Sequence, residues 1–189
     1  GVAQTRKRHC LIASKFERSK LSKAIEELQK DTLSFDDINS NLAAFQELPE
    51  ILEINAELSE ENKKRIQHLH NSNELVLEDA LRPVCHQDGH TYPAVYGRLE
   101  GSKPAGTITT GFMSPGRGRY IHPHEPRMIT IREAARLQAF PDWYFKDAEL
   151  LELSKGRLTK IIGDAVPSLM VYPIISSLIQ SIEGLKKLD

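Results

Sequence analysis

Two arginines near the start of the chain are spaced so that both can act on one ligand. Arg6 and Arg8 lie two residues apart, and the apolar run at 9–14 that follows them predicts a short buried strand. Alternate side chains of an extended segment point the same way, so both forked guanidinium groups can meet the same acceptor-rich partner. Taken alone, such a basic pair is more typical of solvated surface than of a site.

A second group of arginines lies in a stretch rich in glycine. Arg98 follows Gly97, and Arg117 and Arg119 belong to the run Ser-Pro-Gly-Arg-Gly-Arg-Tyr at 114–120. Proline and closely spaced glycines predict a flexible basic loop. A surface loop with incidental charge is the alternative for any one of these arginines.

A third candidate is the turn Gly-Asp-Ala-Val-Pro at 163–167. We expect the glycine to begin a turn and Pro167 to occupy the first turn of the last helix. The carboxylate of Asp164 can only accept hydrogen bonds, for example from an amine or a hydroxyl group. An ordinary helix cap is the alternative interpretation.

The cysteines and histidines do not predict a metal site. Their spacing matches no strong ligand pattern, and the residues concerned are Cys85, His86, His90, His122 and His124. The other cysteine, Cys10, falls in the predicted buried strand. We therefore expect no metal.

Several helices are predicted from caps and periodicity. Apolar residues recur at helical spacing over 20–30, after Ser19 as a cap, and further helices are expected to begin at Ser34 and at Ser59. We expect 71–73 to end the third of these helices. The acidic segment of which they form part is predicted to be a solvated helical face.

The amino-acid composition changes in the second half of the chain. Residues 81–126 are rich in Pro, Gly, aromatic and β-branched residues, which predicts loops and strands, with 107–110 as the clearest strand. Thr130 and Glu133 form a capping box for a helix that Phe140 and Pro141 end. A short helix is expected over 150–153, closed near Gly156. The last helix has a broad apolar stripe, in which Pro173 should produce a kink or shift the start.

Composition and charge indicate a globular protein with charged segments. The 189 residues are 40% hydrophobic and 27% charged, with a net charge of −1. Basic residues prevail over 1–20 and 81–140 and acidic ones over 21–80, a pattern expected if the basic segments contact phosphates. No apolar run approaches the ~20 residues of a membrane span, and two cysteines give no disulfide framework. We expect no membrane association and a cytoplasmic location, such as the bacterial cytoplasm or nucleoid.

Three blocks together resemble the DNA cytosine-5 methyltransferases. The stretch 130–142 (Thr-Ile-Arg-Glu-Ala-Ala-Arg-Leu-Gln-Ala-Phe-Pro-Asp) and the stretch 162–167 (Ile-Gly-Asp-Ala-Val-Pro) are similar to the last two sequence blocks of that family. The stretch 1–9 resembles its Gly-Val-Pro-Gln-x-Arg-x-Arg motif, with Ala3 in place of the usual proline. Asp164 stands where the family more often has asparagine.

The resemblance implies a mixed α/β fold, namely the C-terminal portion of a Rossmann-like, S-adenosylmethionine-dependent methyltransferase with a small α+β target-recognition domain. Residues 1–14 would be a strand segment of the catalytic domain. Residues 15–144 would form the DNA-binding, target-recognition domain, and 145–189 would be helices returning to the catalytic domain. The whole enzyme would transfer a methyl group from S-adenosylmethionine to carbon 5 of cytosine in a specific double-stranded DNA sequence, either in restriction-modification or as a solitary methyltransferase.

The resemblance also implies roles for individual residues. Arg8 would bind the target cytosine at its O2 and Arg6 a nearby phosphate. Thr109 would contact phosphate, while Arg98 and the loop 111–120, with Arg117 and Arg119, would set sequence choice through guanine O6/N7 or contact the DNA backbone. The residues that would contact S-adenosylmethionine are Gly163, Asp164 and Ala165.

The same resemblance makes other charged residues structural. It places the helix at 130–142 under the recognition region, where charged side chains pair with one another in networks. The charged residues concerned are Arg127, Arg132, Glu133 and Arg136.

The family's Gly-rich cofactor turn, its Pro-Cys-Gln loop with the nucleophile and its Glu-Asn-Val strand end are not found in this chain. We therefore expect a fragment without the catalytic cysteine, inactive by itself, binding the cofactor weakly or not at all. The missing N-terminal catalytic part would be supplied in cis or in trans. The alternatives are a natural DNA-recognition subunit of a split methyltransferase and a non-enzymatic DNA-binding module, which the block at 162–167 disfavours.

Overall fold

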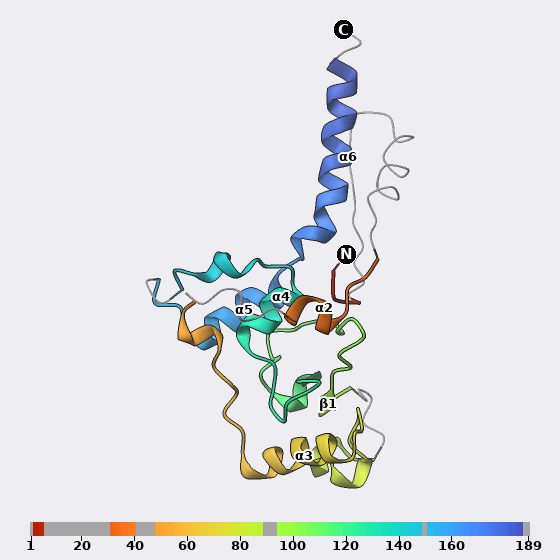
Figure 1. Ribbon diagram of the computed structural model, residues 1–189, viewed down its shortest axis with the longest axis vertical. Helices are drawn as coiled ribbons and strands as arrows, with labels where there is room; N and C mark the ends of the chain where they lie inside the picture. Colours follow the sequence, from red (N-terminus) through yellow and green to blue (C-terminus); the bar gives the residue numbers. More distant parts are fainter. Residues whose placement is uncertain (1, 6–30, 41–47, 89–93, 149–150, 187–189) are drawn as a thin grey trace.

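The chain folds around one helix that is almost entirely buried. The computed structural model describes residues 2–5, 31–40, 48–88, 94–148 and 151–186 (Figure 1). Its helices and strands, in chain order, are α2 (Phe35–Asn39), η2 (Glu50–Leu52), α3 (Glu60–Asn71), η3 (Asp79–Leu81), η4 (Val84–His86), β1 (Gly97–Arg98), η5 (Pro115–Arg117), β2 (Arg119–Ile121), α4 (Ile131–Leu137), η6 (Asp142–Phe145), α5 (Lys155–Asp164) and α6 (Ser168–Lys186).

Helix α4 is the centre of the described structure. It packs against α2, α5, η2 and η6, and all of its residues except Arg136 are buried. Figure 1 shows α2, α4 and α5 as one layer, with α3 at the far end and β1 between them. The largest fully buried side chains come from all of these parts: Phe35, Leu52, Ile66, Leu69, Leu77, Ile108, Phe112, Ile121, Met128, Ile129, Ile131 and Leu137.

Side-chain caps begin the helices where the sequence predicts. Ser34 and Asp37 form a reciprocal capping box at α2, and Ser59 accepts a hydrogen bond from the Asn62 amide at α3. Thr130 and Glu133 form the predicted capping box at α4. The predictions at 9–14 and 20–30 lie outside the described residues.

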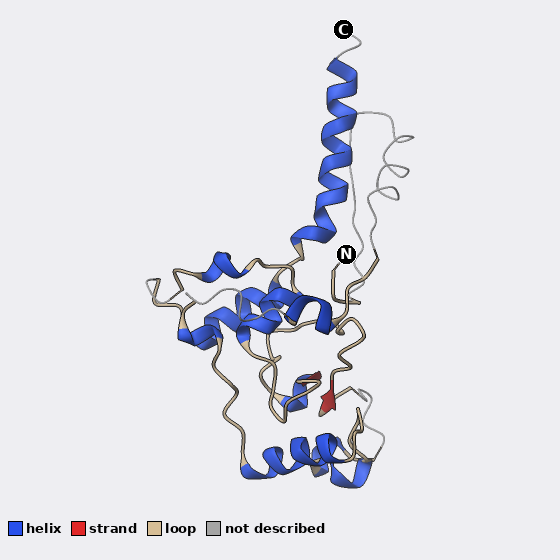
Figure 2. Ribbon diagram, viewed as in Figure 1, coloured by secondary structure: helices blue, strands red, loops and turns tan. Residues whose placement is uncertain are grey.

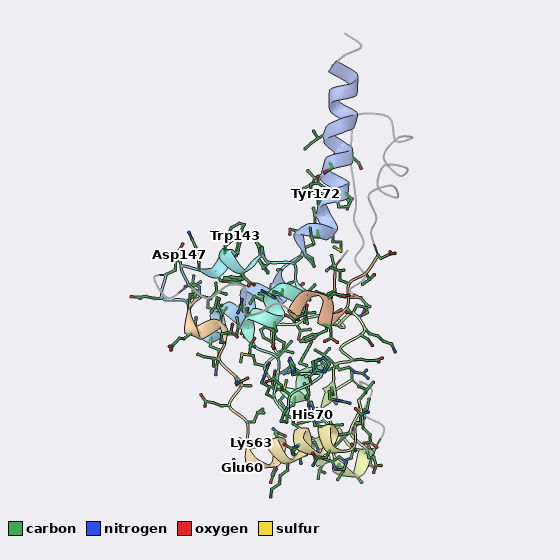
Figure 3. The ribbon with its side chains drawn as sticks, viewed as in Figure 1. Glu60, Lys63, His70, Trp143, Asp147 and Tyr172 are labelled. Carbon is green, nitrogen blue, oxygen red and sulfur yellow. The ribbon has the colours of Figure 1, made fainter. Side chains whose placement is uncertain are left out.

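The exposed face of α3 is solvated, as expected for the acidic segment. Only Ile66 and Leu69 are buried within it. Glu60 and Lys63 form an exposed ion pair of 2.7 Å at one end of this helix (Figure 3).

The sheet is small and does not lie where the sequence predicts. Strands β1 and β2 pair in parallel, with Gly97 opposite Arg119, whereas 107–110 form no strand (Figure 2). The Thr107 carbonyl instead accepts a hydrogen bond from the Tyr120 hydroxyl, at 2.9 Å. The prediction of a strand at 107–110 was therefore wrong, because a side chain meets a backbone group that a neighbouring strand would otherwise satisfy.

Two predicted helix boundaries near the C-terminus were also wrong. Residues 151–152 form a turn, with Glu152 at a φ of 51°, and α5 begins after Ser154, whose side chain caps the Arg157 amide. Gly156 therefore lies inside the first turn of α5 instead of ending a helix. The apolar pattern near 150–153 partly reflects Leu153, which packs on the core.

The helix ends around α4 and α5 also differ in detail from the prediction. Helix α4 ends at Leu137, and Ala139 takes a φ of 61°, two residues before Pro141. Gly163 and Asp164 are the last residues of α5, so the turn before α6 consists of 165–167.

Helix α6 projects from the body and continues through Pro173 (Figure 1). Among the described helices, none is long and apolar enough on its own to cross a membrane; α5 and Ser168–Ile179 together meet the length and composition, with a bend of 43°. The helices and the two-stranded sheet confirm a mixed helix-and-strand structure.

Candidate functional site

The segment that leads to Arg6 and Arg8 is fixed at its base. The Thr5 amide donates to the Ala105 carbonyl and the Ala105 amide donates to the Ala3 carbonyl, each at 2.9 Å. Arg6 and Arg8 themselves lie outside the described residues. The backbone pairing nevertheless sets the point from which they depart, beside residue 105.

One buried amide side chain joins the three blocks singled out in the sequence. Gln138 follows α4 and is 1% exposed; its Oε1 accepts a hydrogen bond from Gln4 Nε2 at 2.9 Å. Its own Nε2 donates to the Ile162 carbonyl in α5 at 2.6 Å. Gln4 Nε2 also donates to the Leu137 carbonyl at 3.1 Å. The blocks at 1–9, 130–142 and 162–167 therefore meet at Gln138.

Gly163 connects α5 to the loop that carries Thr109. A Cβ atom at Gly163 would lie within 2.5 Å of backbone atoms of Thr109 and Thr110. Only glycine permits this approach without movement of the backbone. The geometry therefore gives Gly163 a packing role between the helix and the loop.

The last residue of α5 offers an acceptor at the surface. Asp164 has a side chain 57% exposed and forms an ion pair of 2.5 Å with Lys160. A solvated pair one helical turn apart contributes little stability, about 0.3–0.5 kcal/mol, so the carboxylate can exchange this partner for a ligand donor. Ala165 is half-buried beside it. Asp164 is therefore a solvent-accessible acceptor at the C-terminal end of α5.

The structure separates the three arginines of the glycine-rich region. Arg98 is 9% exposed, and its guanidinium donates to the carbonyls of Glu74 and Pro123 and to Asn73 Oδ1, at 2.8–3.0 Å. These contacts disfavour base reading by Arg98, because DNA would have to displace three protein acceptors. The geometry favours a role in holding 73–74 and 123 around β1.

Arg117 and Arg119 have different surroundings. Arg117 is exposed and Arg119 half-buried, and neither makes a hydrogen bond or ion pair with any residue in the described ranges. Thr109 is exposed, and its Oγ1 lies 3.0 Å from the Tyr120 hydroxyl. The structure thus places the Thr109 loop beside β2, which begins at Arg119, and leaves Arg98 inside.

The charges around α4 form internal networks, which confirms their prediction as scaffold. Arg127 donates to both carboxylate oxygens of Glu133 at 2.8–2.9 Å, and His122 Nε2 lies 3.4 Å from Glu133 Oε1. Burial alone would raise the pKa of Glu133, but hydrogen bonds from Arg127, His122 and the Thr130 amide outweigh it and lower that pKa to about 2. This carboxyl group is therefore a structural element that is charged at neutral pH.

A second network lies on the other side of α4. Asp142 Oδ2 accepts hydrogen bonds from Arg132 at 2.7 Å and from Arg136 at 2.5 Å, and Arg132 also reaches Glu53 at 2.7 Å. Burial would raise the pKa of Asp142, but the hydrogen bonds from Arg136 and Arg132 lower it. Neither arginine is positioned for an external anion.

The cysteine and histidine candidates do not assemble in the part of the chain that is described. No group of three or more His, Cys, Asp or Glu side chains there is arranged to hold a metal ion. Cys85 is exposed, with its Sγ 3.0 Å from His86 Nδ1. His90 and Cys10 lie outside the described residues.

Comparison with known proteins shows the family of this chain. The profile of the family described as C-5 cytosine-specific DNA methylase matches residues 1–180. The chain belongs to this family. It is 37% identical over 177 residues, or 91% of its length, to the type II methyltransferase M1.BsuMI of Bacillus subtilis (strain 168). It is 38% identical over 131 residues, or 68% of its length, to the type II methylase M.HgiDII of Herpetosiphon aurantiacus.

The chain spans about two fifths of the length of these methylase relatives, 39% and 37% respectively. A third relative is shorter than this chain. The match to the type II methyltransferase M.AquIB of Picosynechococcus sp. covers 90 residues at 37% identity, 44% of this chain and 62% of that protein.

Gln138 is the residue of this methylase chain whose importance the sequence analysis missed. The available signal was a neutral polar residue at the end of a helix that otherwise presents apolar and charged residues, directly after buried Leu137. A buried amide requires partners for both its donor and its acceptor. Its two partners lie 134 and 24 residues away, which no local pattern shows.

Proposed function

We propose that this chain supplies the DNA-recognition region and part of the cofactor site of a DNA cytosine-5 methyltransferase. The complete enzyme would methylate carbon 5 of cytosine in a specific double-stranded DNA sequence, with S-adenosylmethionine supplying the methyl group. The names of the relatives M1.BsuMI and M.HgiDII describe type II methylases, which supports a place in restriction-modification.

The observation that carries the proposal is the meeting of the three family blocks at Gln138. The segment entering Arg6 and Arg8, the end of α4 and the last turn of α5 are joined by direct hydrogen bonds. A module that only bound DNA would not need the arginine segment and the last turn of α5 tied to the same residue.

Within this proposal, some residues contact DNA or the cofactor, and others hold the recognition region in place. Arg8 binds the target cytosine, Arg6 and Thr109 contact phosphates, and Asp164 and Ala165 form one edge of the cofactor site. Gly163 allows α5 to approach the Thr109 loop closely, since a Cβ atom there would clash with the backbone of that loop. Arg98 supports the recognition region from within.

We propose the domain division 1–14, 15–144 and 145–189, with the outer two belonging to a Rossmann-like catalytic domain. Exposed apolar residues on and before α6 support this division. They include Val166, Leu169, Tyr172, Ile175 and Ile179, each at least half exposed. Trp143 and Tyr144, also more than half exposed, lie on η6 near the base of α6, and Figure 3 shows Trp143 and Tyr172 there. Such an apolar surface is typical of a face that another part of the protein covers.

The test uses the complete protein, comprising this chain and the catalytic portion that its longer relatives contain. Transfer of tritiated methyl groups from S-adenosylmethionine to duplex DNA should occur, and this chain alone should show none. Arg8→Ala should remove a charge-assisted hydrogen bond worth about 1.5–3 kcal/mol and lower turnover more than it weakens DNA binding. Unchanged turnover at saturating DNA would remove Arg8 from the cytosine site.

A second possibility is that the chain is a natural recognition subunit that works with a separate catalytic chain. The short relative M.AquIB favours this arrangement, because its name is that of a methyltransferase although it is smaller than the present chain. The two arrangements differ in one measurement. Mixing this chain with a separately produced catalytic portion should restore methyl transfer if the parts act in trans.

A further inference from the structure

Strand pairing and packing position Arg119, and polar contacts of its guanidinium group to the described residues do not. It lies opposite Gly97 in the β1–β2 pair, and a Cβ atom at Gly97 would come within 3.0–3.1 Å of the Arg119 side chain. The next residue, Tyr120, is 2% exposed, and its hydroxyl donates to the Thr107 carbonyl at 2.9 Å. The backbone at 119–120 is therefore held firmly, while the guanidinium keeps its donors available.

A pocket of about 220 Å³ opens beside Arg119. Its walls include Glu100, Lys103, Gly106, Thr107, Arg119 and Tyr120. This volume is smaller than that of a site for a whole ligand molecule, typically about 300–1,000 Å³. It suits a single functional group or the edge of a base.

The pocket contains both a forked donor and a carboxylate acceptor. Arg119 has no hydrogen bond or ion pair to the described residues, and Glu100 holds Lys103 at 3.0 Å with its own side chain one-third exposed. In the major groove, guanine presents two acceptors that match arginine, and cytosine presents an amino donor that matches glutamate. Lys103 also lines the pocket and pairs with Glu100, so the two cations of the lining outnumber its one carboxylate. A phosphate would engage only the cations, whereas a G·C pair also supplies an amino donor for Glu100. The mixed lining favours a base pair over a phosphate.

The pocket also lies next to the segment expected at the target cytosine. Gly106 and Thr107 directly follow Ala105, whose backbone pairs with Ala3 and Thr5 immediately before Arg6. A base pair read in this pocket would thus be close to the nucleotide that is methylated.

We propose that Arg119 and Glu100 together read one G·C base pair of the recognition sequence in the major groove, Arg119 at guanine O6 and N7 and Glu100 at the cytosine amino group. Arg117, which is exposed and lies outside this pocket, adds sequence-independent attraction to DNA. This assignment rests on the proposed function and makes it more specific.

The experiment begins with the complete enzyme and the duplex sequence that it methylates, found by mapping methylated cytosines. Absence of any methylation would contradict the proposed function itself, before Arg119 is tested. Binding is then measured for duplexes that each carry one changed base pair, at two salt concentrations, for wild type, Arg119→Ala, Arg119→Lys, Glu100→Gln and Arg117→Ala.

Arg119→Ala and Arg119→Lys should both lose roughly tenfold to a hundredfold of discrimination at the same single G·C pair, because lysine keeps the charge but not the fork. Glu100→Gln should weaken discrimination at that pair and at no other. Arg117→Ala should weaken all duplexes alike and flatten the salt dependence. If Arg119→Lys binds every duplex as wild type does, or if Arg119→Ala weakens all of them equally, Arg119 contacts phosphate and the proposal is overturned.

Discussion

The arginines around α4 and those of the glycine-rich region 94–121 differ in what they bind. Around α4, the guanidinium groups of Arg127, Arg132 and Arg136 face carboxylates, and both central acids, Glu133 and Asp142, are nearly inaccessible to solvent. In the region 94–121, Arg98 faces neutral acceptors, while Arg117 and Arg119 have no polar partner among the described residues.

This difference separates structural charge from charge that can serve a ligand. A guanidinium already bidentate to a buried carboxylate cannot approach a phosphate or base without breaking that pair, which would leave a buried acid uncompensated. An arginine on a glycine-flanked loop has no such cost. Residue type alone would treat both groups as candidates for DNA contact, so the partner decides the role.

The largest effect is expected for Arg127→Ala. Glu133 is 1% exposed and would lose its forked partner, so the free energy of unfolding should fall by about 3–5 kcal/mol. His122 and the Thr130 amide remain as donors, which places the loss toward the lower end. Urea denaturation measures it, with Arg119→Ala as the matched arginine outside the network. A loss below about 1 kcal/mol for Arg127→Ala would contradict the distinction between the two groups.

Acid should weaken the α4 region through the same carboxyl group. The pKa of Glu133 is lowered from its ordinary value of 4.5 to about 2, so the folded state favours the charged form. Its contribution, on the order of 3 kcal/mol, is fully present above pH 4.5 and is lost as the pH falls from 4.5 toward 2. The pKa of Asp142 is also lowered, which adds in the same direction.

Urea midpoints at pH 7, 4 and 3 would test this expectation. In Glu133→Gln the stability should be lower at pH 7 and should depend less on pH below 4.5. A pH dependence identical to that of wild type would show that Glu133 is not the group responsible.

The helix starts could be predicted because a cap is a local interaction. Ser34, Ser59 and Thr130 each bond to an amide three residues ahead, so sequence alone contains both partners. The scaffold role of the α4 charges came from the family resemblance, and the contacts confirm it.

The features that sequence reasoning placed incorrectly, or missed, depend on distant partners. The run at 107–110 has strand-forming residues, but Tyr120 bonds to Thr107 and Gly163 packs against 109–110. The acceptors of Arg98 lie about 25 residues away on both sides, and nothing near Arg98 in sequence indicates them. Partners brought together by folding therefore limited the site prediction more than residue types did.

The smallest effects should sharpen the contrast within the glycine-rich region itself. Arg98→Ala should reduce the free energy of unfolding by about 1–3 kcal/mol, because it leaves the buried carbonyl of Pro123 and two further acceptors without their donor. Arg117→Ala removes an exposed arginine with no hydrogen bond or ion pair to the described residues, so it should change stability by less than about 0.5 kcal/mol.

Thermal and urea denaturation of the two variants, measured side by side, would test the predicted difference in stability. The comparison is matched, since both variants remove an arginine side chain from the same region. DNA affinity supplies the opposite ranking under the proposed function. Arg117→Ala should weaken binding to all duplexes at low salt, whereas Arg98→Ala should do so only to the extent that it unfolds the region. If Arg98→Ala were as stable as wild type and selectively lost discrimination at one base pair, its buried contacts would be dispensable, and Arg98 would belong with the arginines that read DNA.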